Sequence, residues 1–210
     1  MALEGRFGDH HALMCRLHLD HNDHLETAIA RLDARIEQMM EPFACWRDLL
    51  ATIPGIGRHA AAAVISEIGV TVKEFFPDDA HLASWTGLCP GNHQSAGKRR
   101  SGKPRPGNTH LQTLLVECAW SAVRHDGYLK SLFHRHVMKN GGYRSATAKK
   151  KAIVVVAHAL AVIIILATGK PCHELGADYF TSLQDPERET RRLIARLQAL
   201  GHTVTLNPAA

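Results

Sequence analysis

The sequence lacks the features that would direct it out of the cell or into a membrane. Its N-terminus carries His and Asp residues where a secretory signal would need an apolar run, so nothing indicates export. The longest apolar stretch, residues 152–167, is shorter than the ~20 residues that span a bilayer, and it contains His158. We therefore expect a buried core helix there, no membrane partner and a cytoplasmic protein.

Cysteine is scarce and scattered. The five cysteines are odd in number and never adopt a C-x-x-C spacing, so neither a disulfide framework nor a zinc knuckle is indicated. His18, His21 and His24 invite a metal interpretation, but each step of three turns around a helix by about 60°. They would not converge on one ion, and we expect surface histidines and no metal site in this chain.

Acidic residues are absent from two long windows, residues 80–116 and 127–173. A single run of cations is often only a solvated surface, but two such windows favour a polyanionic partner, which we expect to be DNA. The cations of the first window are Lys98, Arg99, Arg100, Lys103 and Arg105, and those of the second are Lys130, Arg135, Lys139, Arg144, Lys149, Lys150 and Lys151.

What the sequence does contain is helical periodicity, which predicts a mainly α protein. Residues 10–41 hold no Pro or Gly, and apolar residues recur there at alternating steps of four and three, which predicts a long coiled-coil helix. Self-association is the expected use of this seam, and antiparallel pairing within the chain remains an alternative. The seam consists of Leu25, Ile29, Leu32, Ile36, Met39 and Phe43.

Three regions follow from this periodicity: a helical arm over 1–45, a compact helical domain over 46–180 and a tail over 181–210. The tail holds one amphipathic stretch, Arg188 to Leu200, before a polar end. In the domain, the turn Ile53–Gly57 between two helical stretches resembles a helix-hairpin-helix. Gly55, Ile56 and Gly57 would then bring backbone N–H groups to a DNA phosphate without reading bases. A plain turn between two helices is the alternative.

Residues 89–108 are rich in Gly, Pro, Ser and basic residues, and we predict a loop there. Ser95 lies in this loop, separated by Ala96 and Gly97 from the cations Lys98, Arg99 and Arg100. These cations would neutralise the extra negative charge on a pentavalent phosphorus, while His93 or another group would take the serine proton. Ser101 has similar surroundings and competes for the role of nucleophile. In the alternative, both serines only donate hydrogen bonds to phosphate oxygens. Lys103 and Arg105 are predicted as further DNA contacts.

The chain resembles the C-terminal half of the IS110/IS116 insertion-sequence transposases over about residues 3 to 180. Several blocks match in the same order, which makes the resemblance specific. They are Ile53–Gly57, Leu82–Gly91, Ser95–Gly102, Leu115–Trp120 and Leu175–Phe180.

This resemblance implies a DNA recombinase in which Ser95 forms a covalent phosphoserine link to DNA during strand transfer. It also implies dimers or tetramers, and a structured guide RNA as a further partner. In the family, an N-terminal RNase H-like domain with four acidic residues binds Mg²⁺. We expect that domain to be missing here, so that no cofactor is held by this chain and Mg²⁺ is needed only with the missing domain.

Two other functions remain open at this stage. One alternative is a non-enzymatic DNA- or RNA-binding dimerisation module that regulates a full-length transposase by joining its oligomer. The other is a structural helix-hairpin-helix protein of DNA repair or junction binding, but this alternative leaves the block Ser95–Arg100 unexplained.

Overall fold

The computed structural model describes residue 5 and residues 7–91, 93–102, 105–167, 170–182 and 186–206. The chain divides into two compact units, Met1–Arg47 and Asp48–Ala210. Helices dominate both units, which confirms the predicted mainly α fold with a long N-terminal helix ahead of a compact helical domain. The regional limits 1–45, 46–180 and 181–210 stay a prediction.

The first unit is built on one long helix, α1, which spans Asp9–Met40. It begins where the backbone N–H of Gly8 donates to Nδ1 of His11 at 3.2 Å, and it ends before Pro42, which lies in the 3-10 helix Glu41–Phe43. Near its end, Glu37 accepts a 2.6 Å hydrogen bond from Nη1 of Arg47. A buried arginine, 5% exposed, is thus held by an ionic hydrogen bond.

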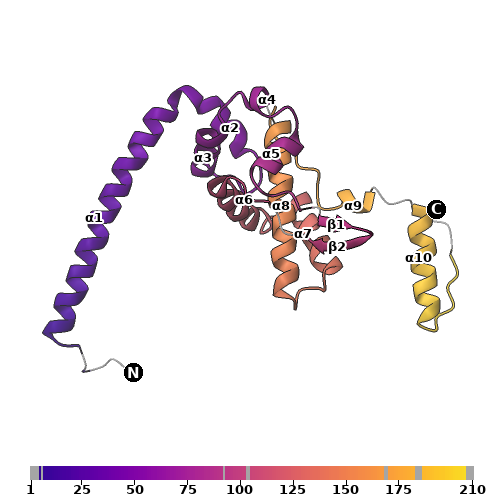
Figure 1. The fold of residues 1–210 in the computed structure, drawn as a ribbon. Coiled ribbons are helices and arrows are strands. Elements are labelled where there is room, and N and C mark those ends of the chain that lie inside the picture. Colours follow the sequence, from indigo (N-terminus) through magenta and orange to yellow (C-terminus); the bar gives the residue numbers. More distant parts are fainter. Residues whose placement is uncertain are drawn as a thin grey trace. The chain divides into compact units, whose positions relative to one another are not determined.

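The core of the second unit is α8, Ala146–Leu166, whose first turn is capped by the Ser145 hydroxyl. Helices α5 (Asp79–Trp85), α6 (Thr109–Ala122) and α7 (Tyr128–Lys139) all pack against it (Figure 1). Its buried side chains confirm the core helix predicted from the apolar stretch. They are Ala148, Ala152, Ile153, Val156, Ala157, Leu160, Ala161, Ile164 and Ile165.

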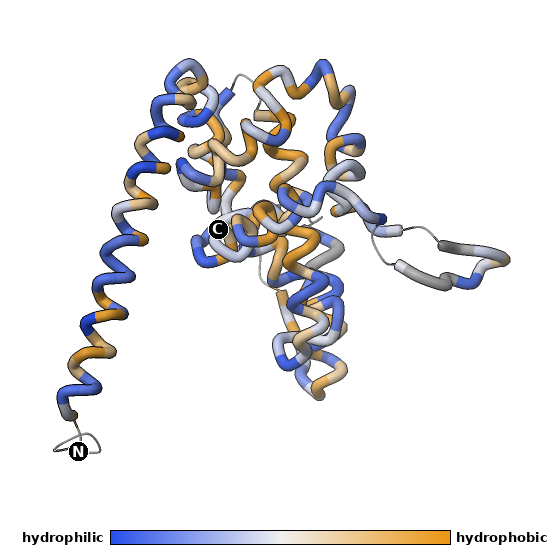
Figure 2. Tube along the Cα trace, turned by 60° about the vertical axis from the view of Figure 1, so that its left-hand side comes forward, coloured by the Kyte–Doolittle hydropathy of each residue, from blue (hydrophilic) through white to orange (hydrophobic). Residues whose placement is uncertain are grey.

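None of the described helices is long and apolar enough to cross a membrane. In α8 the charged residues gather in the first turns, at Lys149, Lys150 and Lys151, and the apolar residues follow. Figure 2 shows the same sequence of polar and apolar segments along the trace. The burial of α8 by neighbouring helices explains its hydrophobicity.

Shorter elements surround this core. Helix α2 covers Ala44–Ala51, α3 covers Arg58–Ile68 and packs on α6, and α4 is the single turn Val72–Phe75. After α8 come α9, Tyr179–Ser182, and α10, Pro186–Ala199. Helix α10 overlaps the stretch expected to be amphipathic. Its Leu193 and Leu197 are exposed, as is Leu200 directly after it.

The one sheet in the described residues joins β1, His93–Ser95, to β2, Lys98–Ser101, as an antiparallel hairpin. This hairpin lies in the connection between α5 and α6, where the sequence predicted only a loop. That prediction is wrong for these residues, because the loop-forming composition conceals a tight turn at Ala96 and Gly97.

The segment after α8 is tied back to the helices at widely separated points. The backbone N–H of Cys172 donates to Oγ1 of Thr52 at 3.0 Å, and the Ser131 hydroxyl donates to the carbonyl of Ala177 at 2.8 Å. Farther along, Tyr179 and Phe180 pack on Tyr128, with ring centroids 5.3 Å away in both cases. These contacts fix the approach of residues 172–180 to α7.

Candidate nucleic-acid interface

Ser95 lies at the tip of the β1–β2 hairpin. Ser95 pairs with Lys98 across a two-residue turn, in which Ala96 has φ 49° and Gly97 has φ 73°. Positive φ at both central residues is the pattern of a type I′ turn, whose twist matches that of the flanking strands. The turn therefore holds Ser95 at a defined place directly opposite Lys98.

This pairing places a hydroxyl beside a cation. Residues directly opposite in an antiparallel pair share one face, with their Cβ atoms about 4.5–5.5 Å apart. Both Ser95 and Lys98 are exposed, and Figure 1 shows the hairpin emerging from the connection between α5 and α6. A phosphate that met the Ser95 hydroxyl would therefore lie within reach of the Lys98 ammonium group.

The other residues of the basic segment that are predicted to contact DNA lie on β2 and after it. Arg99 pairs with Gln94, and Ser101 pairs with His93, while Arg100 falls at the irregularity between these pairs. The side chains of Arg99, Arg100, Ser101 and His93 lie outside the described structure. Lys103 falls wholly outside the described residues, and Arg105 is exposed.

Hydrogen bonds to two backbone carbonyls hold the base of the hairpin segment. The N–H of Asn108 donates to the carbonyl of Trp85 at 2.9 Å, and Nε2 of Gln112 donates to the carbonyl of Gly87 at 3.0 Å. The segments around Trp85 and Gly107 pass so closely that a Cβ on Gly107 would lie 2.5 Å from the Trp85 carbonyl oxygen. The start and the end of the serine segment are thus held together between α5 and α6.

The second predicted contact region is the turn between α2 and α3. Ile53 and Ile56 are buried, and the N–H of Ile56 donates to the carbonyl of Ile53 at 3.0 Å. The turn is therefore anchored by two apolar side chains and an internal hydrogen bond. The side chain of Ile56 serves the core, so any contact with DNA at this residue would be made through the backbone.

Gly55 and Gly57 differ sharply in their surroundings. Gly55 has φ +88°, and a Cβ there would overlap the Cys118 carbonyl oxygen and lie 2.7 Å from the Cβ of Ala122. Gly57 caps the N-terminus of α3 in an extended conformation, is exposed, and has nothing within 4 Å of a built Cβ. Gly55 faces α6, while Gly57 faces open space at the positive end of a helix.

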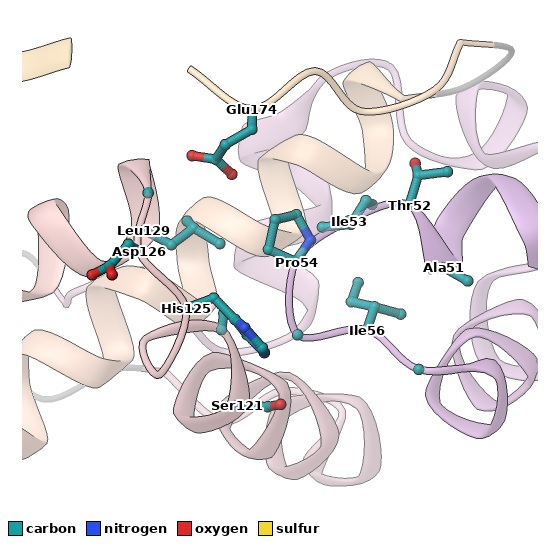
Figure 3. Close-up of a pocket in the computed structure, with 14 residues that line it drawn as sticks. Ala51, Thr52, Ile53, Pro54, Ile56, Ser121, His125, Asp126, Leu129 and Glu174 are labelled. Atoms are coloured by element: carbon teal, nitrogen blue, oxygen red, sulfur yellow. The ribbon is translucent and has the colours of Figure 1, made fainter. Parts of the chain in front are cut away.

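A cavity of about 480 Å³ lies beside this turn (Figure 3). Thr52, Ser121, His125, Asp126 and Glu174 supply its polar lining. Glu174 accepts the N–H of Tyr128 at 2.5 Å and so caps α7. Hydrogen bonding to Lys130 holds the pKa of Asp126 below its usual value, and the negative charge of this carboxylate disfavours a phosphate here.

Sequence reasoning did not identify this cavity, because its residues come from three separate segments. The available signal was Glu174, the first acid after the long acid-free window. Its position in sequence does not reveal that it reaches back to cap α7.

The described residues offer no group of three or more His, Cys, Asp or Glu side chains that could hold a metal ion. His18, His21 and His24 are exposed along α1. A Mg²⁺ ion needs oxygen ligands in near-octahedral geometry, usually including carboxylates. The described part of the chain does not fit such an ion.

Residues 47–134 match the family model described as Transposase IS116/IS110/IS902 family. The "Insertion element IS110 uncharacterized 43.6 kDa protein" of Streptomyces coelicolor is 30% identical over 106 residues, which cover 50% of this chain and 25% of the relative. The "Pilin gene-inverting protein" of Moraxella lacunata is 39% identical over 79 residues, which cover 36% of this chain and 24% of the relative. The matches thus span about a quarter of each relative.

Proposed function

We propose that the chain binds DNA and takes part in the transposition of an insertion sequence, because residues 47–134 match the model of the IS116/IS110/IS902 transposase family. Its nucleophile is Ser95, at the tip of the β1–β2 hairpin. The observation that carries the proposal is the register that sets the exposed Ser95 directly opposite Lys98.

The proposed reaction is a phosphodiester exchange at Ser95. The Oγ–P bond forms as the P–O bond to the leaving sugar oxygen breaks, the serine proton passes to a base, and the leaving oxygen gains a proton. No net hydrolysis occurs, so the bond energy is kept in the phosphoserine link and the step can be reversed on another strand. Lys98 stabilises the negative charge that develops on the phosphoryl oxygens.

The turn between α2 and α3 provides the proposed second grip on DNA. The first-turn N–H groups of a helix have no partner within that helix, and together with the helix dipole they favour a phosphate. Gly57 leaves the approach to α3 open because it carries no side chain. This contact gives affinity without sequence preference, as expected of a helix-hairpin-helix.

Charge removal at the hairpin tip tests the DNA contact. We expect Lys98→Gln to weaken binding of duplex DNA. The slope of log K, the logarithm of the binding constant, against the logarithm of the salt concentration should fall in magnitude by about one. The control is Lys73→Gln, which removes an equal, exposed charge from α4. Fluorescence anisotropy from 50 to 200 mM salt measures both, and equal slopes for the two variants would contradict a contact at Lys98.

Self-association through α1 is a further part of the proposal. Leu25, Ile29, Leu32 and Ile36 are all exposed, at 46%, 56%, 63% and 42%. An apolar heptad seam of this kind is covered when a second helix packs along it. A second copy of the chain, or a full-length transposase with the same seam, supplies that helix.

A charge in the seam should dissociate the assembly. We expect Leu32→Glu to convert an oligomer into a monomer in size-exclusion chromatography with light scattering, because a buried unpaired carboxylate is costly. Ala34→Glu adds the same charge to an exposed position outside the seam and should leave the assembly intact. A monomeric parent protein, or an oligomeric Leu32→Glu variant, would refute self-association through the seam.

The alternative function is a non-enzymatic DNA- or RNA-binding module that regulates a transposase by joining its oligomer. The exposed seam on α1 favours it. In this alternative the chain lowers the rate of a full-length transposase when the two are mixed. In the leading proposal, an added acidic metal-binding domain instead makes the chain active with Mg²⁺.

A guide RNA encoded by the element is a further proposed partner.

A further inference from the structure

The strongest unexplained surface of the second unit lies along α7, the loop that follows it, residues 177–180 and α10. A cleft of about 630 Å³ opens there, within the ~300–1,000 Å³ range of ligand sites. Four cationic or basic side chains line it: Lys130, His134, Arg135 and Arg192. Its apolar lining consists of Met138, Tyr143, Ala177 and Phe180.

The electrostatics of this surface are strongly one-sided. Among the described residues that line the cleft, Asp126 is the one carboxylate, and it accepts a hydrogen bond from Lys130 at 2.5 Å. No acid follows it in the sequence until Glu174. The pKa of His136 lies below its usual value because burial disfavours its charged form and Lys139 and Arg135 add positive potential.

Aromatic groups in the cleft are positioned by their neighbours. The Arg135 guanidinium lies over the Phe180 ring at 5.0 Å, and Tyr128 stacks against that ring at 5.3 Å. Tyr143 is 46% exposed, and its hydroxyl lies 3.0 Å from Nδ1 of His134. The Lys149 ammonium group lies 6.0 Å from the centroid of the Tyr143 ring.

Cations that follow a backbone and aromatic faces that stack on bases are the two components of single-strand binding sites. A duplex hides the faces of its bases, so it would use the cations and leave the aromatic residues idle. We propose that this cleft binds an unpaired nucleic-acid strand, with a base stacked on Tyr143 and a phosphate at Arg135. This site is distinct from the Ser95 hairpin and from the N-terminus of α3.

Tyr143→Ala is the primary test, measured by anisotropy with a fluorescent dT12 strand and with a 12-bp duplex. We expect about tenfold weaker binding of the strand, because base stacking on an aromatic side chain is lost, and less than twofold change for the duplex. Tyr143→Phe should keep the affinity of the parent protein, since it retains the ring. A matching rU12 strand distinguishes RNA from DNA as the preferred source.

Arg135→Gln provides a second, charge-based test, with Lys73→Gln as its matched control. We expect weaker strand binding and a smaller salt slope for Arg135→Gln alone. A Tyr143→Ala variant that loses strand and duplex affinity equally, or that binds dT12 like the parent protein, would overturn the inference.

The hairpin variant Lys98→Gln keeps the two proposals separable. It should weaken duplex binding while leaving the Tyr143-dependent preference for dT12 in place. Loss of duplex binding without a Tyr143 effect refutes the cleft alone, and the reverse result refutes the hairpin contact alone. Thermal unfolding of each variant shows whether a loss of binding reflects a loss of fold.

Discussion

Ser95→Ala should abolish the covalent link between the protein and DNA while leaving DNA affinity within about twofold of the parent protein. Removal of a nucleophile typically lowers the rate by orders of magnitude, about 10³-fold or more. The exposed hydroxyl at the hairpin tip contributes little to binding by itself, since Lys98 and other cations supply the electrostatic attraction. Catalysis and binding should therefore separate in this one variant.

The experiment uses the 210-residue chain and labelled DNA covering both ends of the insertion sequence that is proposed to encode it. The adduct is detected by denaturing gel electrophoresis, with and without Mg²⁺ and the acidic domain of an IS110 relative. Ser101→Ala is the matched control, because it removes the same hydroxyl from the far end of β2 and should keep the adduct. An adduct formed by Ser95→Ala, or its loss in Ser101→Ala, would transfer the chemistry away from Ser95.

Gly55→Ala should destabilise the second unit by about 2–5 kcal/mol. The substitution adds a Cβ to a residue with φ +88° and drives it against the backbone of α6 at Cys118 and Ala122. A positive φ costs a non-glycine residue roughly 1–2 kcal/mol, and overpacking against a rigid helix adds about 1–3 kcal/mol. Denaturant unfolding followed by tryptophan fluorescence measures the change.

Gly57→Ala is the matched control, since its Cβ would meet nothing within 4 Å and its φ of −83° suits any residue. Its stability should stay within about 1 kcal/mol of the parent protein. Its affinity for duplex DNA should nevertheless fall, because the methyl group would stand between a phosphate and the start of α3. A stable Gly55→Ala variant would show that the turn can move away from α6.

The two glycines of the turn show what a motif can and cannot predict. The pattern Ile53–Gly57 predicted a tight turn between helices, and the structure has one. In the sequence both glycines received the same interpretation, namely close approach of the backbone to a phosphate. The structure separates them, because α6 arrives from more than 50 residues away and lies against Gly55.

The serine segment illustrates the opposite problem. Gly, Pro and basic residues predicted a loop because they are poor strand formers. The hairpin depends on Ala96 adopting φ 49° before Gly97, and alanine gives no signal for that conformation. The usual signal for such a turn, Asn-Gly or Asp-Gly, is absent, so the pairing of Ser95 with Lys98 could not be read from the sequence.

The sequence alone determined the elements whose information is local. The helical periodicity of the proline-free residues 10–41 specifies α1, and the apolar run specifies the core helix α8, because periodicity and hydrophobicity belong to the residues themselves. Tertiary structure alone decided which residues meet. Glu174 caps α7 from 46 residues away, and Phe180 joins Arg135 in the aromatic cleft. Such contacts depend on how the helices pack around α8, which no local pattern encodes.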